Sequence, residues 1–268
     1  MKKLGLIIAV VVIAVAIGAC LYSFSPLAPT VSAKEIRDKA VEALANVTTV
    51  DASLEMKMSF MGQEISMTGR ILVDYVDKEM AMNVTLVMPP TPETLIIMYY
   101  VNETMYMGMS QPPEAPPSWV KIEVPIEQLE TAFTPLNASI ADIEVEYLGS
   151  EVVDEVDCYI LALKPNISEV WKYALMLNPE LAQLVGNINV SEVIKKLDIK
   201  IWISKSDYML KREVVDMRIE YMGVAVDTTM TITINAYNTP IEITVPQEAR
   251  EAQPIMLVKA FKSCQSRM

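Results

Sequence analysis

The sequence predicts a mainly β protein of the α+β class, built on one large, curved antiparallel sheet with helices packed in its concave face. Three observations support this. Apolar and polar residues alternate over many short segments, as in half-buried strands. Short turns join these segments in order, so successive strands are expected to pair in antiparallel fashion. Helical spacing is confined to the start of the chain and to one central insertion, which favours helices on one face of the sheet.

The first 20 residues have the parts of an export signal. Lys2 and Lys3 form a basic end, an uncharged apolar run follows, and small residues precede Cys20. The four residues ending at Cys20 resemble a lipobox, which implies cleavage before Cys20 and a lipid on its sulfur. Residues 1–19 are therefore interpreted as an export signal or as an uncleaved membrane anchor, because residues 4–24 could span a bilayer. Either way, the remaining chain is expected on the extracytoplasmic face of the cell membrane.

A tether, one domain and a tail follow. Residues 20–33 are rich in Ser, Pro and Ala and predict a short tether, residues 34–250 form the domain, and residues 251–268 form a polar tail. The formal net charge of −12 disfavours nucleic acid as a partner, because binding phosphates requires a basic face. The chain has no histidine, which removes the usual general base and a common metal ligand. No cofactor and no metal are expected.

The domain begins with a helix at residues 33–47, where apolar side chains have helical spacing. Gly69 suggests a β-bulge, and Asn102-Glu103 a hairpin turn. Strands are expected at residues 54–60, 65–75, 80–88, 95–101, 105–109, 119–124, 143–148, 158–163, 199–204, 209–221, 224–236 and 241–245. Further helices are expected at residues 126–133, 167–184 and 190–197, and the segment 167–197 is a candidate lid.

Six asparagines lie in Asn-x-Ser/Thr sequons, which accept glycans on exported chains and must then be at the surface. These are Asn46, Asn83, Asn102, Asn137, Asn166 and Asn189. Asn83 points away from the apolar face of its expected strand, which agrees with a glycan there. Sequons combined with a lipobox suggest a glycoprotein of an archaeal cell surface.

Two further features leave alternatives open. Cys158 and Cys264 either form a disulfide outside the cell or stay as one buried and one exposed thiol. Asp154, Glu155 and Asp157 either form a solvated acidic turn or a weak calcium site.

Five segments, taken in order, resemble a known superfamily. They are Gly69–Tyr75, Tyr100–Met107, Trp119–Lys121, Val156–Leu161 and Ile201–Arg212. Their order resembles the LolA-like superfamily of periplasmic lipoprotein carriers and LppX-LprG-like lipoproteins. The resemblance implies a half-open barrel, with helices closing its mouth around a cavity for acyl chains. It carries over no catalytic residue. The carriers are soluble shuttles, whereas an anchored chain favours a fixed lipid-binding or sensing protein.

Methionine is unusually frequent, with 19 residues, many at alternate positions of expected strands. Three interpretations remain: the methionines fill a packed core, they line a cavity in which flexible thioethers adapt to acyl chains, or they bind Cu(I). The absence of histidine disfavours copper. The candidate cavity-lining residues are Met56, Met58, Met67, Met82, Met105, Met107, Met109 and Met230.

The sequence thus predicts a non-enzymatic, membrane-anchored extracytoplasmic protein that binds lipid or lipoprotein acyl chains in a Met-rich cavity. It contains no hydrolase, Walker or zinc motif. The expected partners are a lipid or an acylated protein, and the membrane through the N-terminal anchor. The alternative is an extracytoplasmic interaction or sensor domain with a packed core and no lipid ligand.

Overall fold

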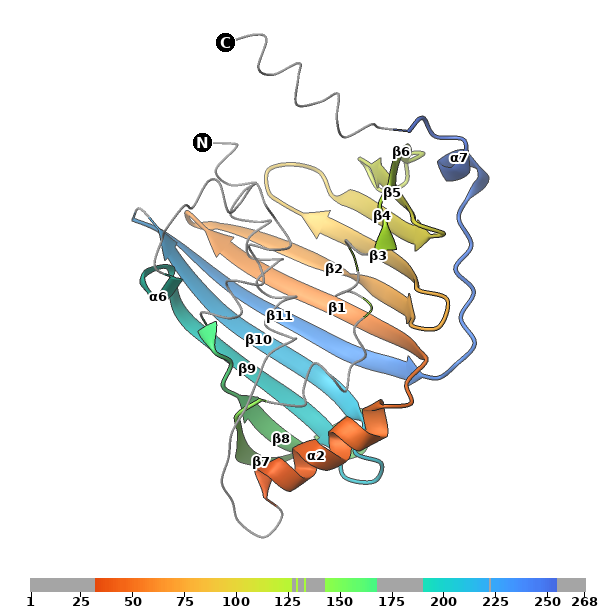
Figure 1. Ribbon diagram of the computed structural model, residues 1–268. Helices are drawn as coiled ribbons and strands as arrows, with labels where there is room; N and C mark the ends of the chain where they lie inside the picture. Colours follow the sequence, from red (N-terminus) through yellow and green to blue (C-terminus); the bar gives the residue numbers. More distant parts are fainter. Residues whose placement is uncertain are drawn as a thin grey trace.

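The fold is one open, curved antiparallel sheet (Figure 1). The computed structural model describes residues 32–126, 129, 133, 143–167, 190–221 and 223–254. Within these residues the sheet has 11 strands in the order β6-β5-β4-β3-β2-β1-β11-β10-β9-β8-β7. The strands are β1 (Thr49–Phe60), β2 (Gln63–Asp74), β3 (Glu79–Val87), β4 (Thr94–Val101), β5 (Thr104–Ser110), β6 (Ser118–Glu123), β7 (Val145–Val153), β8 (Val156–Leu163), β9 (Ile194–Ser204), β10 (Leu210–Tyr221) and β11 (Val224–Tyr237). The mainly β class and the large antiparallel sheet are confirmed.

Tight turns explain the antiparallel order. Asn102 and Glu103 both have positive φ angles, 50° and 58°, and join β4 to β5. Asp154 and Glu155 do the same between β7 and β8, with φ of 48° and 65°. Two successive residues of positive φ give a turn whose twist matches that of the paired strands, and such a turn needs only two residues. The hairpin expected at Asn102-Glu103 is confirmed.

One face of the sheet is mainly apolar. In β1, Leu54, Met56 and Met58 are buried while Glu55 and Lys57 between them are exposed. The cross-strand registers carry this alternation from strand to strand, so that every neighbour of a buried β1 residue lies on the same side. We call this side the inner face and the opposite side the outer face.

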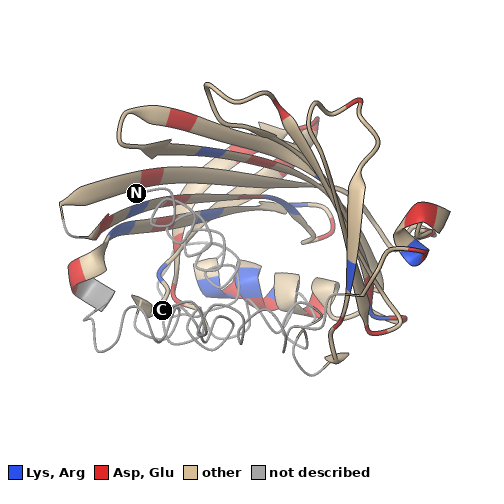
Figure 2. Cartoon of the chain, turned by 90° about the horizontal axis from the view of Figure 1, so that it is seen from above, with Lys and Arg blue, Asp and Glu red and all other residues tan. Residues whose placement is uncertain are grey.

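The helix α2 (Ala33–Leu44) packs at the β7 end of the sheet. Ser32 caps it, with the Glu35 backbone N–H donating to Ser32 Oγ at 3.0 Å. Its buried residues Ile36, Ala40 and Leu44 join the same hydrophobic cluster as inner-face residues of β7 to β11. Arg37 Nη1 donates to the Ile143 carbonyl at 3.3 Å and fixes the helix beside β7. In Figure 2 the sheet arches over α2.

The expected helix at residues 190–197 is wrong in its second half. The structure has only one turn, α6 (Val190–Val193), before β9 begins at Ile194. Pairing with β10 explains why residues 194–197 form a strand and not a helix. Leu197 lies opposite Met217, and Ile194 lies opposite Ile219. These cross-strand contacts bury apolar side chains and override the local helical spacing. Most of the expected helices at residues 126–133 and 167–184 lies outside the described residues.

The expected strand at residues 241–245 is also wrong. The segment Asn238–Pro246, which we call the strap, is extended. Its first backbone N–H, that of Asn238, donates to the Thr49 carbonyl at 3.1 Å, but from Thr239 onward the strap joins no strand ladder among the described residues. Instead it crosses the outer face and leads to the short helix α7 (Gln247–Arg250) beside β5 and β6. Figure 1 shows it rising from the end of β11 to α7, and Figure 2 shows α7 and α2 on opposite sides of the sheet. Prolines at both ends of residues 241–245 remove N–H donors that a ladder would need.

Side-chain contacts hold the strap and α7 in place. Ile241, Ile243 and Val245 alternate toward the sheet, and Val245 and Ala249 are buried. At its far end, Lys121 Nζ donates to the Arg250 carbonyl at 2.7 Å. The strap therefore covers part of the outer face.

No helix among the described residues is both long and apolar enough to cross a membrane. The expected signal or anchor (residues 1–19), Cys20 and nearly all of the tether lie outside the described residues. So do Cys264 and most of the expected tail.

Candidate functional site

The inner face of β2 to β6 carries a row of apolar side chains in direct cross-strand register. Met82 lies opposite Ile71 and Met98, and Met107 lies opposite Met98 and Val120. We call these five residues the methionine row. Because neighbouring strands lie about 4.8 Å apart, the row extends for roughly 19 Å across the sheet.

A second line of apolar side chains joins the methionine row to the centre of the sheet. Met56 on β1 lies opposite both Met230 on β11 and Met67 on β2, and Met67 lies opposite Leu86 on β3. The inner face is thus continuously apolar from β11 to β3.

Burial divides the inner face into two regions. Met56, Met58 and Met230 are buried, with exposed fractions of 3%, 4% and 5%. Every member of the methionine row is only half-buried. The centre of the sheet is therefore packed core. In the β2–β6 region Val73, Val84 and Tyr100 on the same face are buried, but the methionine row presents apolar surface that the described residues do not fully cover.

The eight methionines proposed from the sequence all occupy inner-face register positions. Met56, Met58 and Met230 belong to the packed region, whereas Met67, Met82, Met105 and Met107 are half-buried and Met109 is exposed at the rim. Whether they line a lipid cavity stays a prediction.

Sequence reasoning missed Met98, which lies at the middle of the methionine row. Its strand, Thr94–Val101, is apolar on both faces, so alternation alone gives no reason to choose Met98 over Ile97. The only available signal was the register of the β4–β5 hairpin. Counting outward from Asn102-Glu103 places Met98 opposite Met107.

Two buried polar side chains interrupt the inner face. Glu213 on β10 lies opposite Ile201 and Ile232 and is 8% exposed. Thr228 on β11 lies opposite Met58 and Met217 and is 4% exposed.

Tyrosines lie at the end of the sheet nearest Glu213. Burial raises the pKa of Tyr75 to about 12. Burial also raises the pKa of Tyr237, and electrostatic interaction with the nearby acidic groups of Tyr75, Asp207 and Glu213 raises it further. Tyr237 donates its hydroxyl to the Leu210 carbonyl at 2.8 Å. Both phenols are therefore neutral at physiological pH, and this end of the face adds no tyrosinate charge.

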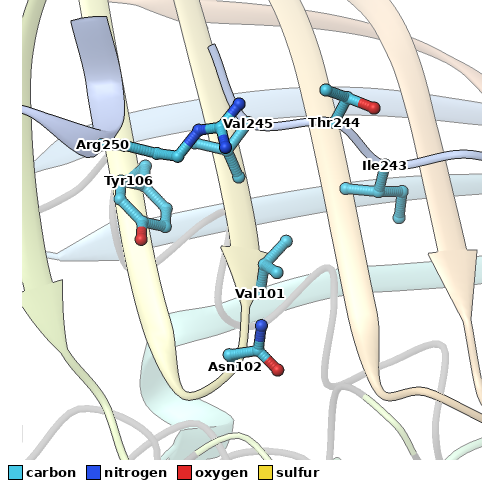
Figure 3. Close-up of a pocket in the computed structure, with 7 residues that line it drawn as sticks. All are labelled: Val101, Asn102, Tyr106, Ile243, Thr244, Val245 and Arg250. Carbon is cyan, nitrogen blue, oxygen red and sulfur yellow. The ribbon is translucent and has the colours of Figure 1, made fainter. Parts of the chain in front are cut away.

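The outer face has small cavities beneath the strap. One of about 280 Å³ lies between the β4–β5 hairpin and the strap, and Figure 3 shows the Arg250 side chain reaching from α7 toward Val245. A second, of about 230 Å³, lies between the strap and outer-face residues of β2 to β4, including Arg70 and Tyr99. Arg70 is already engaged, because its Nε and Nη2 donate to Asp51 at 2.8 and 2.6 Å. These cavities are open and partly polar, and the Met-bearing inner face lies on the other side of the sheet.

The expected modification sites are exposed where the structure describes them. Asn46, Asn83, Asn102 and Asn166 are all exposed, whereas Asn137 and Asn189 lie outside the described residues. Exposure is necessary for a glycan but does not demonstrate one, so glycosylation stays a prediction.

Cys158 is fully buried, and burial raises the pKa of its thiol. Its pairing with Cys264 stays untested. The acidic turn at Asp154, Glu155 and Asp157 is engaged in ion pairs, with Asp157 accepting from Lys205 at 3.1 Å. Among the described residues, no cluster of three or more His, Cys, Asp or Glu side chains could hold a metal.

Comparisons with known proteins place the fold. The model of a family of unknown function (DUF6612) matches residues 32–254. The crystal structure of the Mycobacterium tuberculosis lipoprotein LppX resembles this one with a TM-score of 0.50 and 12% identity, covering 79% of this chain and 97% of LppX. LprF from Mycobacterium bovis has a TM-score of 0.47 and 17% identity, covering 81% of this chain and 96% of LprF. No curated protein matches the sequence. The likeness to LppX confirms the expected LolA-like fold.

Proposed function

The chain belongs to a family of unknown function (DUF6612), and we propose that it is a membrane-tethered extracytoplasmic protein that holds acyl chains of a lipid or lipoprotein on its inner face. One observation carries this proposal. The methionine row presents five apolar side chains, aligned across five strands, that remain half-exposed. Aligned apolar surface of this kind is costly to leave in water and is typical of a site for an apolar ligand or partner.

The chemistry of the row suits an acyl chain. Met82, Met98 and Met107 are unbranched and flexible, so their thioethers can repack around chains of different length and saturation. Each methylene removed from water stabilises the complex by ~0.8 kcal/mol. A long chain therefore binds without any charged contact, and the row itself contains no charged residue.

The tethered location rests on the first 20 residues of the sequence. In the proposal, α2 closes the β7 end of the concave face, where Ile36, Ala40 and Leu44 are buried in the common cluster. The methionine row at the opposite end of the sheet then remains accessible to acyl chains from the nearby membrane.

Charge placed in the methionine row tests this proposal. In the double variant Met98→Glu and Met107→Glu, two carboxylates replace apolar contacts, and burying them against a hydrocarbon is strongly unfavourable. We expect at least about tenfold less lipid to co-purify with the full-length protein, measured by native mass spectrometry and lipid extraction. Met61→Glu is the matched control, because Met61 is 67% exposed in the β1–β2 turn. Equal lipid content in the double variant and the control would contradict the site.

A protein-interaction or sensor role is the second candidate, and the β7 edge favours it. Among the described residues β7 pairs only with β8, and Val152 and Leu148 on it are 64% and 45% exposed. An unpaired strand with exposed apolar residues can accept a strand from a partner. Wild-type protein that co-purifies with no lipid, but with a protein that Val152→Lys releases, would replace the lipid proposal with this one.

A further inference from the structure

Thr228 is a buried hydroxyl surrounded by apolar side chains. It lies on the inner face, with Met58 and Met217 opposite it on the two neighbouring strands, and it is 4% exposed. In the part of the chain that the structure describes, its Oγ1 has no hydrogen-bond partner. The next residue, Thr229, points to the outer face and donates to Asp216 at 2.6 Å.

An unpaired buried hydroxyl destabilises a fold, since it has lost its hydrogen bonds to water. Valine has nearly the same shape and would fill the space beside Met58 and Met217 without that loss. A threonine at this position is therefore better explained by a polar atom that is present when the protein is loaded. Thr228, Met58 and Ile65 are consecutive register partners leading from β11 through β1 to β2, and Ile65 lies six residues, or about 20 Å, along β2 from Ile71 in the methionine row. An acyl chain with its carbonyl at Thr228 would therefore extend along the inner face toward the row.

We propose that Thr228 Oγ donates a hydrogen bond to the carbonyl oxygen of an ester- or amide-linked acyl chain on the inner face. This inference rests on the proposed function and specifies its ligand class. An acyl chain linked as an ester or amide has a neutral acceptor at its first carbon, whereas a plain hydrocarbon has none. This uncharged carbonyl oxygen can accept the hydrogen bond of the Thr228 hydroxyl without placing a charge among the methionines.

Charge disfavours the free fatty acid as the ligand. Glu213 lies buried on the same face, four residues along β10 from Met217, which is opposite Thr228. At about 3.3 Å per residue this distance is roughly 13 Å. A fatty-acid carboxylate beside Thr228 would lose its hydration and would also face an acidic group across a low-dielectric surface.

Ligands of equal chain length test the inference in the full-length protein. Binding of methyl palmitate, hexadecane and palmitate is measured by native mass spectrometry on delipidated wild type, Thr228→Val and Thr228→Ser. Thr231→Val is the matched control, because Thr231 is only half-buried and lies on the outer face of the same strand. Thermal unfolding of each variant confirms folding. We expect Thr228→Val to bind methyl palmitate about three- to tenfold more weakly, with hexadecane unchanged.

The other outcomes are distinct. Thr228→Ser keeps the hydroxyl and should retain most of the preference for methyl palmitate, and wild type should prefer the ester over palmitate. If Thr228→Val binds both neutral ligands as wild type does, or weakens both equally, the hydroxyl has no role in recognition and the inference is wrong. If wild type binds none of the three ligands, the proposed function itself fails.

Discussion

At the scale of single residues, Gly69 determines how closely β2 and β3 can pack. A Cβ atom at this position would lie 2.1 Å from the Asn83 carbonyl oxygen and 2.6 Å from Val84 Cγ1. The registers with β1 and β3 run through Gly69 without a shift, so the expected bulge is wrong. The glycine is required by a close approach of backbone and not by an extra residue in the strand.

Gly69→Ala should therefore destabilise the protein by about 3 kcal/mol, because a backbone carbonyl cannot move without disturbing the β2–β3 ladder. Urea unfolding followed by circular dichroism measures this. Gly108→Ala is the control: its Cβ would meet the Trp119 ring at 2.8 Å, and that half-buried side chain can shift. We expect a cost of about 1 kcal/mol or less there. Equal costs at the two glycines would show that the close backbone contact is not decisive.

Residue-level prediction from the sequence succeeded where one face of a strand is buried. The alternation of β1 correctly places Leu54, Met56 and Met58 on the buried side. It could not select Met98, since both faces of β4 are apolar, and it gave no sign that Thr228 would lack a partner. Both facts depend on which residue of a neighbouring strand lies opposite, and register is fixed by turns and bulges along the whole hairpin.

At the scale of elements, the strap stabilises the outer face through alternating side chains and not through a ladder. Val245 is buried at 7% exposure, while Thr244 beside it is exposed. Sequence reasoning assigned this segment to the sheet because its alternation is that of a strand. Alternation reports only that one side is buried, and an extended segment crossing a sheet satisfies it equally well.

Val245→Asp is expected to destabilise the protein by about 3 kcal/mol, because the carboxylate would be buried against β4 and β5 and pairing with the exposed Arg250 would offset little of its lost hydration. Thr244→Asp, one residue away and pointing outward, should change stability by less than about 0.5 kcal/mol. Chemical unfolding of both variants is the measurement. A strap that only rests loosely on the sheet would make the two substitutions indistinguishable.

At the scale of the whole molecule, the sheet remains open. Among the described residues, β6 and β7 are its two edges and do not pair with each other. Packed core occupies the centre, around Met56, Met230 and α2, while the β2–β6 region keeps its half-buried methionines. The sequence predicted the class, most strands and the superfamily fold. The unequal burial of the two regions follows from how three-dimensional packing covers the face, and no local pattern encodes it.

Ligand binding to this half-buried region should stabilise the whole fold. A ligand that binds only the native state at 100 times its Kd adds about 2.7 kcal/mol to the free energy of unfolding. For a domain of this size that corresponds to a rise in Tm of roughly 5–10 °C. Differential scanning calorimetry of delipidated protein with and without methyl palmitate measures it. The variant carrying Met98→Glu and Met107→Glu should show no rise, and an equal rise in that variant would place binding elsewhere.

The strap has a mechanical consequence for this open sheet. Its nine residues, Asn238–Pro246, can reach at most about 30 Å when fully extended, and five to six strand spacings between β11 and β6 span about 24–29 Å. The segment is thus close to taut. Curling a sheet more tightly lengthens the path along its convex side, which a taut segment resists. The strap would then limit the curvature of the sheet and keep the concave face open when no ligand is bound. A ligand could enter without first separating the two ends of the sheet.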